Sequence, residues 1–74
     1  MTINAKDIDL KKIKRTIDEY VYINGCYPKY IIMNYETLLK IKNQYTENYV
    51  YKIFDIKIAI DFETENINFS TEWQ

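Results

Sequence analysis

Apolar side chains recur at helical spacing over residues 8–24, which makes this stretch the most regular in the sequence. The members of the stripe are Leu10, Ile13, Ile17, Tyr20 and Val21. Asp7 or Asp9 precedes it and supplies a carboxylate that accepts hydrogen bonds from the free N–H groups of a first helical turn. Asn24-Gly25 follows it, and glycine readily adopts the left-handed conformation that ends a helix. The spacing therefore predicts an amphipathic α-helix over residues 8–24.

A short apolar run, KYIIMN at residues 29–34, follows Pro28. Because it shows no alternation with polar residues, it predicts a strand that is buried on both faces. Asn34 ends the run and is also a favourable N-cap, since its side-chain oxygen can accept from the backbone of the next turn. Apolar residues then recur at helical spacing and end near residues 43–45. The sequence therefore predicts a strand and a second helix that meet at Asn34 without a loop.

The remaining third of the chain has the composition and alternation of β-structure. Residues 46–48 predict a turn, and residues 49–54 are rich in residues that favour strands. Apolar side chains then alternate strictly with polar or small ones in two runs, Ile56, Ile58, Ile60 and Phe62 in the first and Ile67, Phe69, Thr71 and Trp73 in the second. This alternation predicts one face toward the core and one toward water. Residues 63–66 between the runs predict an antiparallel hairpin, and Asp55 marks either a tight turn or a bend.

These elements predict an α+β fold of order α-β-α-β-β-β, with two helices packed on one face of a small, mostly antiparallel sheet. The 74 residues suit a single domain over residues 1–74, with residues 1–6 loose. The chain is 47% hydrophobic and 16% aromatic, so it is expected to fold. A core of this size is worth only about 3–5 kcal/mol net, so self-association or very good packing is expected to supplement it.

The sequence offers little material for metal binding or catalysis. Cys26 is the only cysteine and histidine is absent, which excludes an internal disulfide and a Cys/His zinc site. The lone cysteine predicts a buried thiol in a reducing compartment. With one glycine, the chain has no glycine-rich phosphate loop, and no nucleophile–base pair is apparent. We therefore expect neither an enzyme nor a bound cofactor or metal.

Charge is nearly balanced overall but unevenly distributed. The formal net charge is −1, with nine Lys/Arg and six Asp/Glu in residues 1–54, and one Lys and five acids in residues 55–74. The basic run Lys11, Lys12, Lys14 and Arg15 is interpreted as a solvated helix face. Direct binding to nucleic acid is therefore not expected. No apolar run approaches the ~20 residues that span a bilayer, and no signal peptide is recognisable, so a cytoplasmic protein without membrane attachment is expected.

Aromatic and acidic side chains supply the candidate binding residues. Tyrosine is favoured at protein interfaces because it combines a large rigid area with a hydroxyl group. A flat array of carboxylates can also imitate a phosphate backbone, although a solvated acidic edge is the alternative interpretation. The candidate partner-binding residues are the tyrosines that are hard to bury together, the terminal tryptophan and the acids of the last two strands: Tyr22, Tyr27, Tyr49, Tyr51, Asp61, Glu63, Glu65, Glu72 and Trp73.

The stretches PKYIIMNYETLLKI and YKIFDIKIAID resemble the β-α-β-β segment of tailed-phage major capsid proteins and related small phage proteins. In that family a strand–helix joint of the form P-x-x-I-x-M-N-x-x-T precedes a hydrophobic strand pair that ends in Asp. The matching positions are Pro28, Ile31, Met33, Asn34, Thr37, Ile53, Phe54, Ile56, Ile58, Ile60 and Asp61, and Asp55 stands where the family pattern has Gly. The resemblance implies an origin in a phage or mobile element.

The overall profile, small, nearly neutral and without catalytic groups, is similar to that of phage-encoded inhibitors of bacterial defence such as anti-CRISPR proteins. The leading hypothesis is therefore a non-enzymatic inhibitor that binds and blocks a host defence nuclease or complex in the host cytoplasm. A second hypothesis is a small structural or interaction module that assembles into a homodimer or higher oligomer. A third is an oligomer that sequesters a nucleotide signal with Lys/Arg and stacked Tyr side chains.

Overall fold

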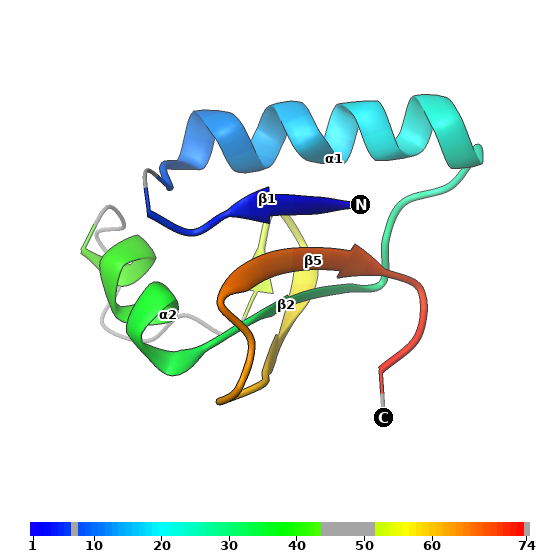
Figure 1. Ribbon diagram of the computed structural model, residues 1–74. Helices are drawn as coiled ribbons and strands as arrows, with labels where there is room; N and C mark the ends of the chain where they lie inside the picture. Colours follow the sequence, from blue (N-terminus) through cyan, green and yellow to red (C-terminus); the bar gives the residue numbers. More distant parts are fainter. Residues whose placement is uncertain (7, 44–51, 74) are drawn as a thin grey trace.

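The computed structural model of the protein describes residues 1–6, 8–43 and 52–73. Within these residues the chain forms an α+β fold with two helices and a five-stranded, mostly antiparallel sheet (Figure 1). The elements in chain order are β1 (Thr2–Asn4), α1 (Leu10–Asn24), β2 (Tyr30–Met33), α2 (Tyr35–Lys42), β3 (Lys52–Ile53), β4 (Ile56–Ile60) and β5 (Asn66–Ser70). The α+β class and both helices are as the sequence predicts. The predicted turn at residues 46–48 and the first half of the predicted strand at 49–54 lie outside the described residues.

The ends of α1 follow from its capping residues. Asp9 is the N-cap, and its Oδ1 accepts a hydrogen bond from the backbone N–H of Lys12 over 2.8 Å. At the other end Gly25 has φ 74°, and its N–H donates to the carbonyl of Val21 over 2.8 Å. Glycine fits this left-handed position because it has no Cβ. The helix therefore begins at Leu10, just after its cap, and ends where the sequence predicts.

The predicted joint at Asn34 is confirmed. The strand β2 ends at Met33, and Asn34 caps α2 by accepting a hydrogen bond from the N–H of Thr37 over 2.8 Å. The amide group of the same side chain also donates from Nδ2 to the carbonyl of Thr64 over 2.9 Å. One side chain therefore ends the strand, starts the helix and holds a segment thirty residues away in sequence.

The predicted hairpin between the last two strands is wrong. The sheet order is β1-β5-β2-β4-β3, so β2 lies between β4 and β5. It pairs with β4 in parallel, with Ile31 opposite Ile58, and with β5 antiparallel, with Ile31 opposite Phe69. Residues 61–65 therefore cross the end of β2 instead of making a tight turn, and the N–H of Asp61 donates to the carbonyl of Met33 over 2.9 Å at that crossing.

The burial pattern of β2 explains why it takes the centre. Three of its four residues, Ile31, Ile32 and Met33, are buried, although they point alternately to opposite faces. In a central position, the side chains of strands on both sides pack beside its own on each face, whereas an edge strand has such neighbours on one side only. The requirement to bury this apolar run therefore outweighs the local preference of β4 and β5 for a hairpin.

Both helices contribute side chains to the core on one face of the sheet. Ile13, Ile17 and Tyr20 of α1 and Ile41 of α2 belong to one buried cluster with the strand residues Ile31, Met33, Ile53, Ile56, Ile67 and Phe69. Figure 1 shows α1 running along the sheet and α2 near the end at which β2 leaves it. The opposite face, which we call the open face, carries the alternate strand positions and is not covered by either helix.

One edge of the sheet differs from the predicted pattern, whereas at the other edge the structure has the tight turn that was one of the two alternatives at Asp55. The sequence predicts no element before residue 7, whereas Thr2–Asn4 form the edge strand β1, and Oγ1 of Thr2 donates to Oδ1 of Asn68 over 2.6 Å. At the other edge, β3 and β4 are joined by the two-residue turn Phe54-Asp55, with φ values of 52° and 67°. Positive φ at both positions fits the twist of a tight hairpin, but a bulky Phe is strained there.

Candidate binding site

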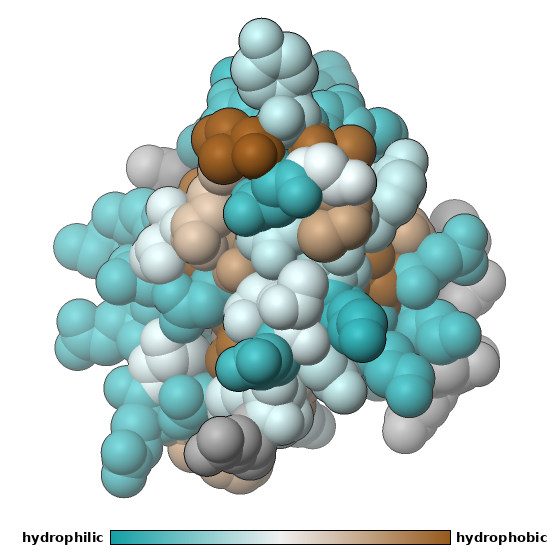
Figure 2. All heavy atoms as spheres, turned by 90° about the vertical axis from the view of Figure 1, so that its right-hand side faces the viewer, coloured by the Kyte–Doolittle hydropathy of each residue, from teal (hydrophilic) through white to brown (hydrophobic). Residues whose placement is uncertain are grey.

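The end of α1 and the loop after it form an exposed apolar surface. Tyr22 is 91% exposed, Ile23 is 69% exposed and Tyr27 is 66% exposed. In Figure 2, brown and pale atoms gather near the top of the molecule, where α1 ends. Cys26 is exposed as well, so the expectation of a buried thiol is wrong. The loop places it outside the core because α1 ends at Asn24 and Gly25, its C-cap, turns the chain away from the helix.

A pocket lies where this loop enters β2 and meets the β3–β4 hairpin. It has a volume of about 370 Å³ and is lined from one side by Tyr27, Pro28, Lys29 and Tyr30 and from the other by Lys52, Asp55, Ile56 and Lys57. We call it the lysine–tyrosine pocket. The two sides meet because β2 and β4 are parallel, so that both strands begin at the same end of the sheet, with Tyr30 opposite Lys57.

The charge of the lysine–tyrosine pocket is unbalanced. Lys29, Lys52 and Lys57 are exposed and face one carboxylate, that of Asp55. Lys52 and Lys57 are direct partners across the antiparallel β3–β4 pair, an arrangement that is unfavourable for like charges. Within the described parts of the chain, no ion pair involves any of these three lysines. The pocket therefore concentrates positive charge that is not neutralised by an ion pair among the described residues.

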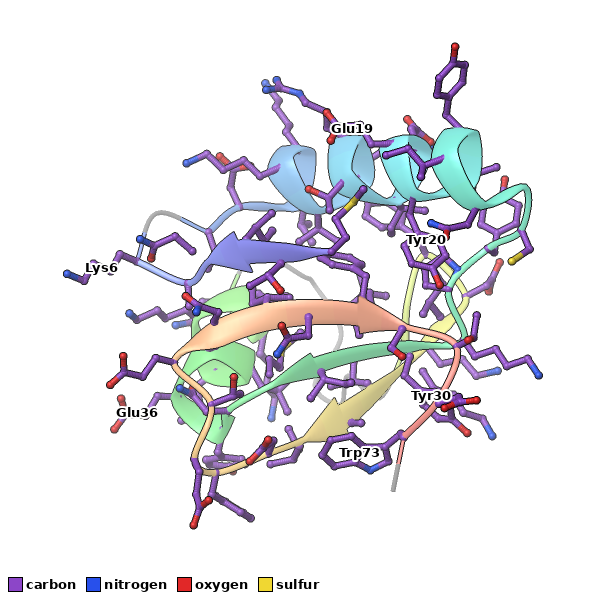
Figure 3. All side chains as sticks on the ribbon, turned by 45° about the vertical axis from the view of Figure 1, so that its right-hand side comes forward. Lys6, Glu19, Tyr20, Tyr30, Glu36 and Trp73 are labelled. Carbon is purple, nitrogen blue, oxygen red and sulfur yellow. The ribbon has the colours of Figure 1, made fainter. Side chains whose placement is uncertain are left out.

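The backbone on the β2 side of the lysine–tyrosine pocket is held in place by the neighbouring strand and by a proline. The N–H of Lys29 donates to the carbonyl of Ser70 over 3.0 Å, which ties the pocket to β5. Pro28 is buried and restricts the backbone ahead of β2. Figure 3 shows Tyr30 at this end of the sheet, with Trp73 nearby where the chain turns back after β5. Trp73 is 40% exposed.

A second charged feature is the crossing segment at residues 61–65. The carboxylate of Asp61 accepts from the N–H of Glu63 over 3.0 Å, and its carbonyl accepts from the N–H of Thr64 over 3.3 Å. Glu63 and Glu65 are exposed, and Phe62 is 80% exposed between the acids. The expectation that Phe62 faces the core is wrong, because β4 ends at Ile60 and the alternation stops there.

The four predicted acidic residues do not form one surface. Asp61, Glu63 and Glu65 lie in the crossing segment before β5, whereas Glu72 follows β5 at its other end, next to Trp73. Among the predicted tyrosines, Tyr22 and Tyr27 are exposed at the end of α1. Tyr49 and Tyr51 lie outside the described residues.

The basic run of α1 also borders an apolar hollow. Phe54 lines it together with Leu10, Lys11, Lys14, Arg15 and Asp18. Nζ of Lys14 donates to Oδ1 of Asp18 over 2.7 Å, and this hydrogen bond raises the pKa of Lys14, with smaller contributions from the Asp18 charge and from Tyr27. Both partners of the pair are more than half exposed, so it contributes little to stability.

The sequence pattern does not predict the exposure or pairing of three residues that belong to the candidate sites. The sequence places Phe54 and Phe62 in stretches that predict strands, and it places Lys57 at a polar position of an alternating strand. Their exposure and pairing depend on where β4 begins and ends. The one available signal was Asp55, which favours turns and so places Phe54 beside it in the loop.

Several kinds of site are not seen in the described residues. Residues 1–6, 8–43 and 52–73 contain no group of three or more Cys, Asp or Glu side chains placed to hold a metal ion. In the same residues, neither helix combines the length and the apolar character needed to cross a membrane.

Comparisons of the chain with protein-family models, with curated proteins and with solved structures find no significant match. The described residues show a small α+β fold with charged surfaces that also carry aromatic rings.

Proposed function

We propose that the protein is a non-enzymatic inhibitor, of phage type and acting in the host cytoplasm, that binds and blocks a host defence nuclease or complex. The observation that carries this proposal is the crossing segment, in which the 80% exposed ring of Phe62 stands between Asp61 and Glu63. An exposed aromatic ring flanked by acids suits a basic groove that ordinarily holds nucleic acid, since the ring fills an apolar site and the acids replace phosphates.

The crossing segment is held in one conformation, which supports its use as a contact. The side chain of Asn34 donates to the carbonyl of Thr64, and the N–H of Asp61 donates to the carbonyl of Met33. Oγ1 of Thr64 also donates to the carbonyl of Asn66 over 3.1 Å. A preorganised loop loses less conformational freedom on binding than a mobile one, so more of its contact energy remains as affinity.

The test captures the partner and then measures its inhibition. Immobilised protein is exposed to host lysate, the retained proteins are identified by mass spectrometry, and nuclease activity of the captured complex is measured with and without the inhibitor. Phe62→Ala and Glu63→Lys/Glu65→Lys are each expected to weaken inhibition about tenfold or more. Asp61 is left unchanged because its side chain accepts a hydrogen bond from the loop backbone.

The matched control changes the same number of charges elsewhere. Asp18 and Glu19 are exposed acids on α1, outside the crossing segment, and Asp18→Lys/Glu19→Lys should leave inhibition unchanged. Full inhibition by the Phe62→Ala and Glu63→Lys/Glu65→Lys variants would contradict the proposal, and so would equal loss in the control.

A second candidate function, self-assembly, is favoured by the apolar surface at the end of α1. Tyr22 and Ile23 are both largely exposed there, and adjacent exposed apolar side chains favour association. Light scattering of the purified protein measures this directly. A stable high-order oligomer that dissociates on Tyr22→Ser/Ile23→Ser would support assembly and would count against a simple occluding inhibitor.

A further inference from the structure

The lysine–tyrosine pocket is a second surface that the proposed inhibitor function does not use. It lies at the end of the sheet where β2 and β4 begin, whereas the crossing segment lies where these strands end. We propose that this pocket binds a nucleoside monophosphate, with its phosphate on the lysines and its base on the tyrosines.

The lysines provide the site for the phosphate. Lys52 and Lys57 are cross-strand partners on one face of the β3–β4 hairpin, and both line the pocket, as Lys29 does from the β2 side. A dianionic phosphate between them converts the repulsion of the cross-strand pair into two charge-assisted hydrogen bonds. Asp55 is the one acid among the described residues that line the pocket, and its repulsion of the phosphate favours a position over the lysines.

The tyrosines provide the site for the base. Tyr27 is 66% exposed and Tyr30 is partly exposed, and they flank Pro28 along one wall of the pocket. Bases stack on aromatic side chains regardless of sequence because each base has a π-face. The carboxylate of Asp55 is an acceptor within the same pocket, suited to the hydroxyl groups of a sugar. The pocket thus holds cations for a phosphate, an acceptor for sugar hydroxyls and aromatic rings for a base.

The size and shape of the pocket select a small ligand. A volume of about 370 Å³ lies at the lower end of the range of small-molecule sites, about 300–1,000 Å³. The pocket is bounded by the loop before β2 on one side and by the Phe54-Asp55 turn on the other. One nucleotide therefore fits this space better than a continuous strand, which would need an extended groove of positive charge.

The test is an NMR titration of the ¹⁵N-labelled protein with AMP and GMP, and separately with adenosine, inorganic phosphate and octathymidylate. We expect AMP or GMP to shift the backbone amides of the residues that line the pocket, and to bind at least about tenfold more tightly than adenosine or phosphate alone. Binding should weaken as salt is raised, because it depends on exposed charges.

Two variants separate the roles of charge and ring. Lys52→Gln/Lys57→Gln should weaken AMP binding about tenfold or more while leaving the melting temperature unlowered, since it removes a like-charge pair. Lys6→Gln/Lys40→Gln makes the same charge change at exposed positions away from the pocket and should bind AMP normally. Tyr27→Leu should weaken binding of AMP but not of inorganic phosphate.

Each of the following results would overturn the proposal. The first is that neither AMP nor GMP shifts the pocket amides. The second is that phosphate alone binds as tightly as the nucleotides, which would show a simple anion site. The third is that octathymidylate binds much more tightly, with shifts spread over the open face. None of these results depends on the host partner, so the inhibitor proposal stands or falls separately.

Discussion

Replacing Asn34 by alanine removes two hydrogen bonds with one substitution. The cap to the N–H of Thr37 and the bond to the carbonyl of Thr64 are 2.8 and 2.9 Å long. Loss of an N-cap costs about 1 kcal/mol, and loss of a partly buried hydrogen bond costs about another 1 kcal/mol. We expect Asn34→Ala to lower the free energy of unfolding by about 2 kcal/mol, a large share of the ~3–5 kcal/mol available to a chain of this size.

The chain contains a matched control for the cap alone. Asp9 caps α1 through the same kind of bond, 2.8 Å long, to the N–H of Lys12. Asp9→Ala should therefore cost about 1 kcal/mol. Thermal unfolding followed by circular dichroism measures both, with expected losses in melting temperature of roughly 4–8 °C for Asp9→Ala and about twice that for Asn34→Ala.

A third variant isolates the long-range bond. Asn34→Asp keeps an oxygen for the cap but replaces the donating amide with a second oxygen that faces the carbonyl of Thr64. It should destabilise the protein even though aspartate is a good N-cap. If Asn34→Ala costs no more than Asp9→Ala, or if Asn34→Asp is as stable as the natural sequence, the bond to Thr64 does not hold the crossing segment and the reasoning is refuted.

Four further predictions concern the backbone, the core and surface charge. Gly25→Ala should lower the free energy of unfolding by about 1 kcal/mol because φ is 74° there, although a Cβ would meet no atom within 4 Å. Gly25→Asn should lower it less. Thermal melting measures both, and equal stability of the two variants and the natural sequence would contradict this reasoning. Asp55 has a φ of 67°, a left-handed conformation that glycine adopts readily and alanine does not. Asp55→Gly should therefore be at least as stable as the natural sequence, and Asp55→Ala should be less stable. The reverse order would contradict a left-handed turn. Ile31 is fully buried in the central strand, so Ile31→Val should lower the free energy of unfolding in urea by about 0.5–1.5 kcal/mol and Ile31→Ala by about 2–5 kcal/mol. A small effect of Ile31→Ala would contradict the central position of β2. The hydrogen bond from Lys14 to Asp18 raises the pKa of Lys14, so any stabilisation it gives is complete below the ordinary value of 10.5 and is lost as pH rises through the raised pKa. Because both side chains are exposed, Asp18→Asn should barely change the melting temperature at pH 7. A clear drop in melting temperature would contradict this view.

The helices of this protein could be predicted from the sequence, but the order of its strands could not. The caps at Asp9 and Asn34 and the stop at Gly25 depend on neighbours a few residues away, so local chemistry determines them. Strand pairing depends on which strands compete for the centre of the sheet. The apolar run of β2 predicts burial on both faces, and such burial favours a central position, where side chains of two neighbouring strands pack beside its own. The prediction of a hairpin instead relied on the fact that β4 and β5 are neighbours in sequence.

The candidate sites divide in the same way. Tyr22 and Tyr27 were predicted at a surface because a small core cannot hold many tyrosines, and both are exposed. The lysine–tyrosine pocket was not predicted, because it forms only when the parallel pairing of β2 and β4 brings Tyr30 beside Lys57. The contact between Lys52 and Lys57 further depends on a turn of two residues, and a turn one residue longer would move them out of register.

The central place of β2 has a consequence for how the chain folds. Among the described strands, only β3 and β4 are both adjacent in sequence and paired, so most of the sheet forms from contacts between distant segments. Such a topology folds slowly for its size, because loop closure precedes most of the stabilising contacts. In the unfolded chain, the alternating runs of β4 and β5 are free to pair directly with each other. That local hairpin would be a kinetic trap, since it must open before β2 can enter the sheet.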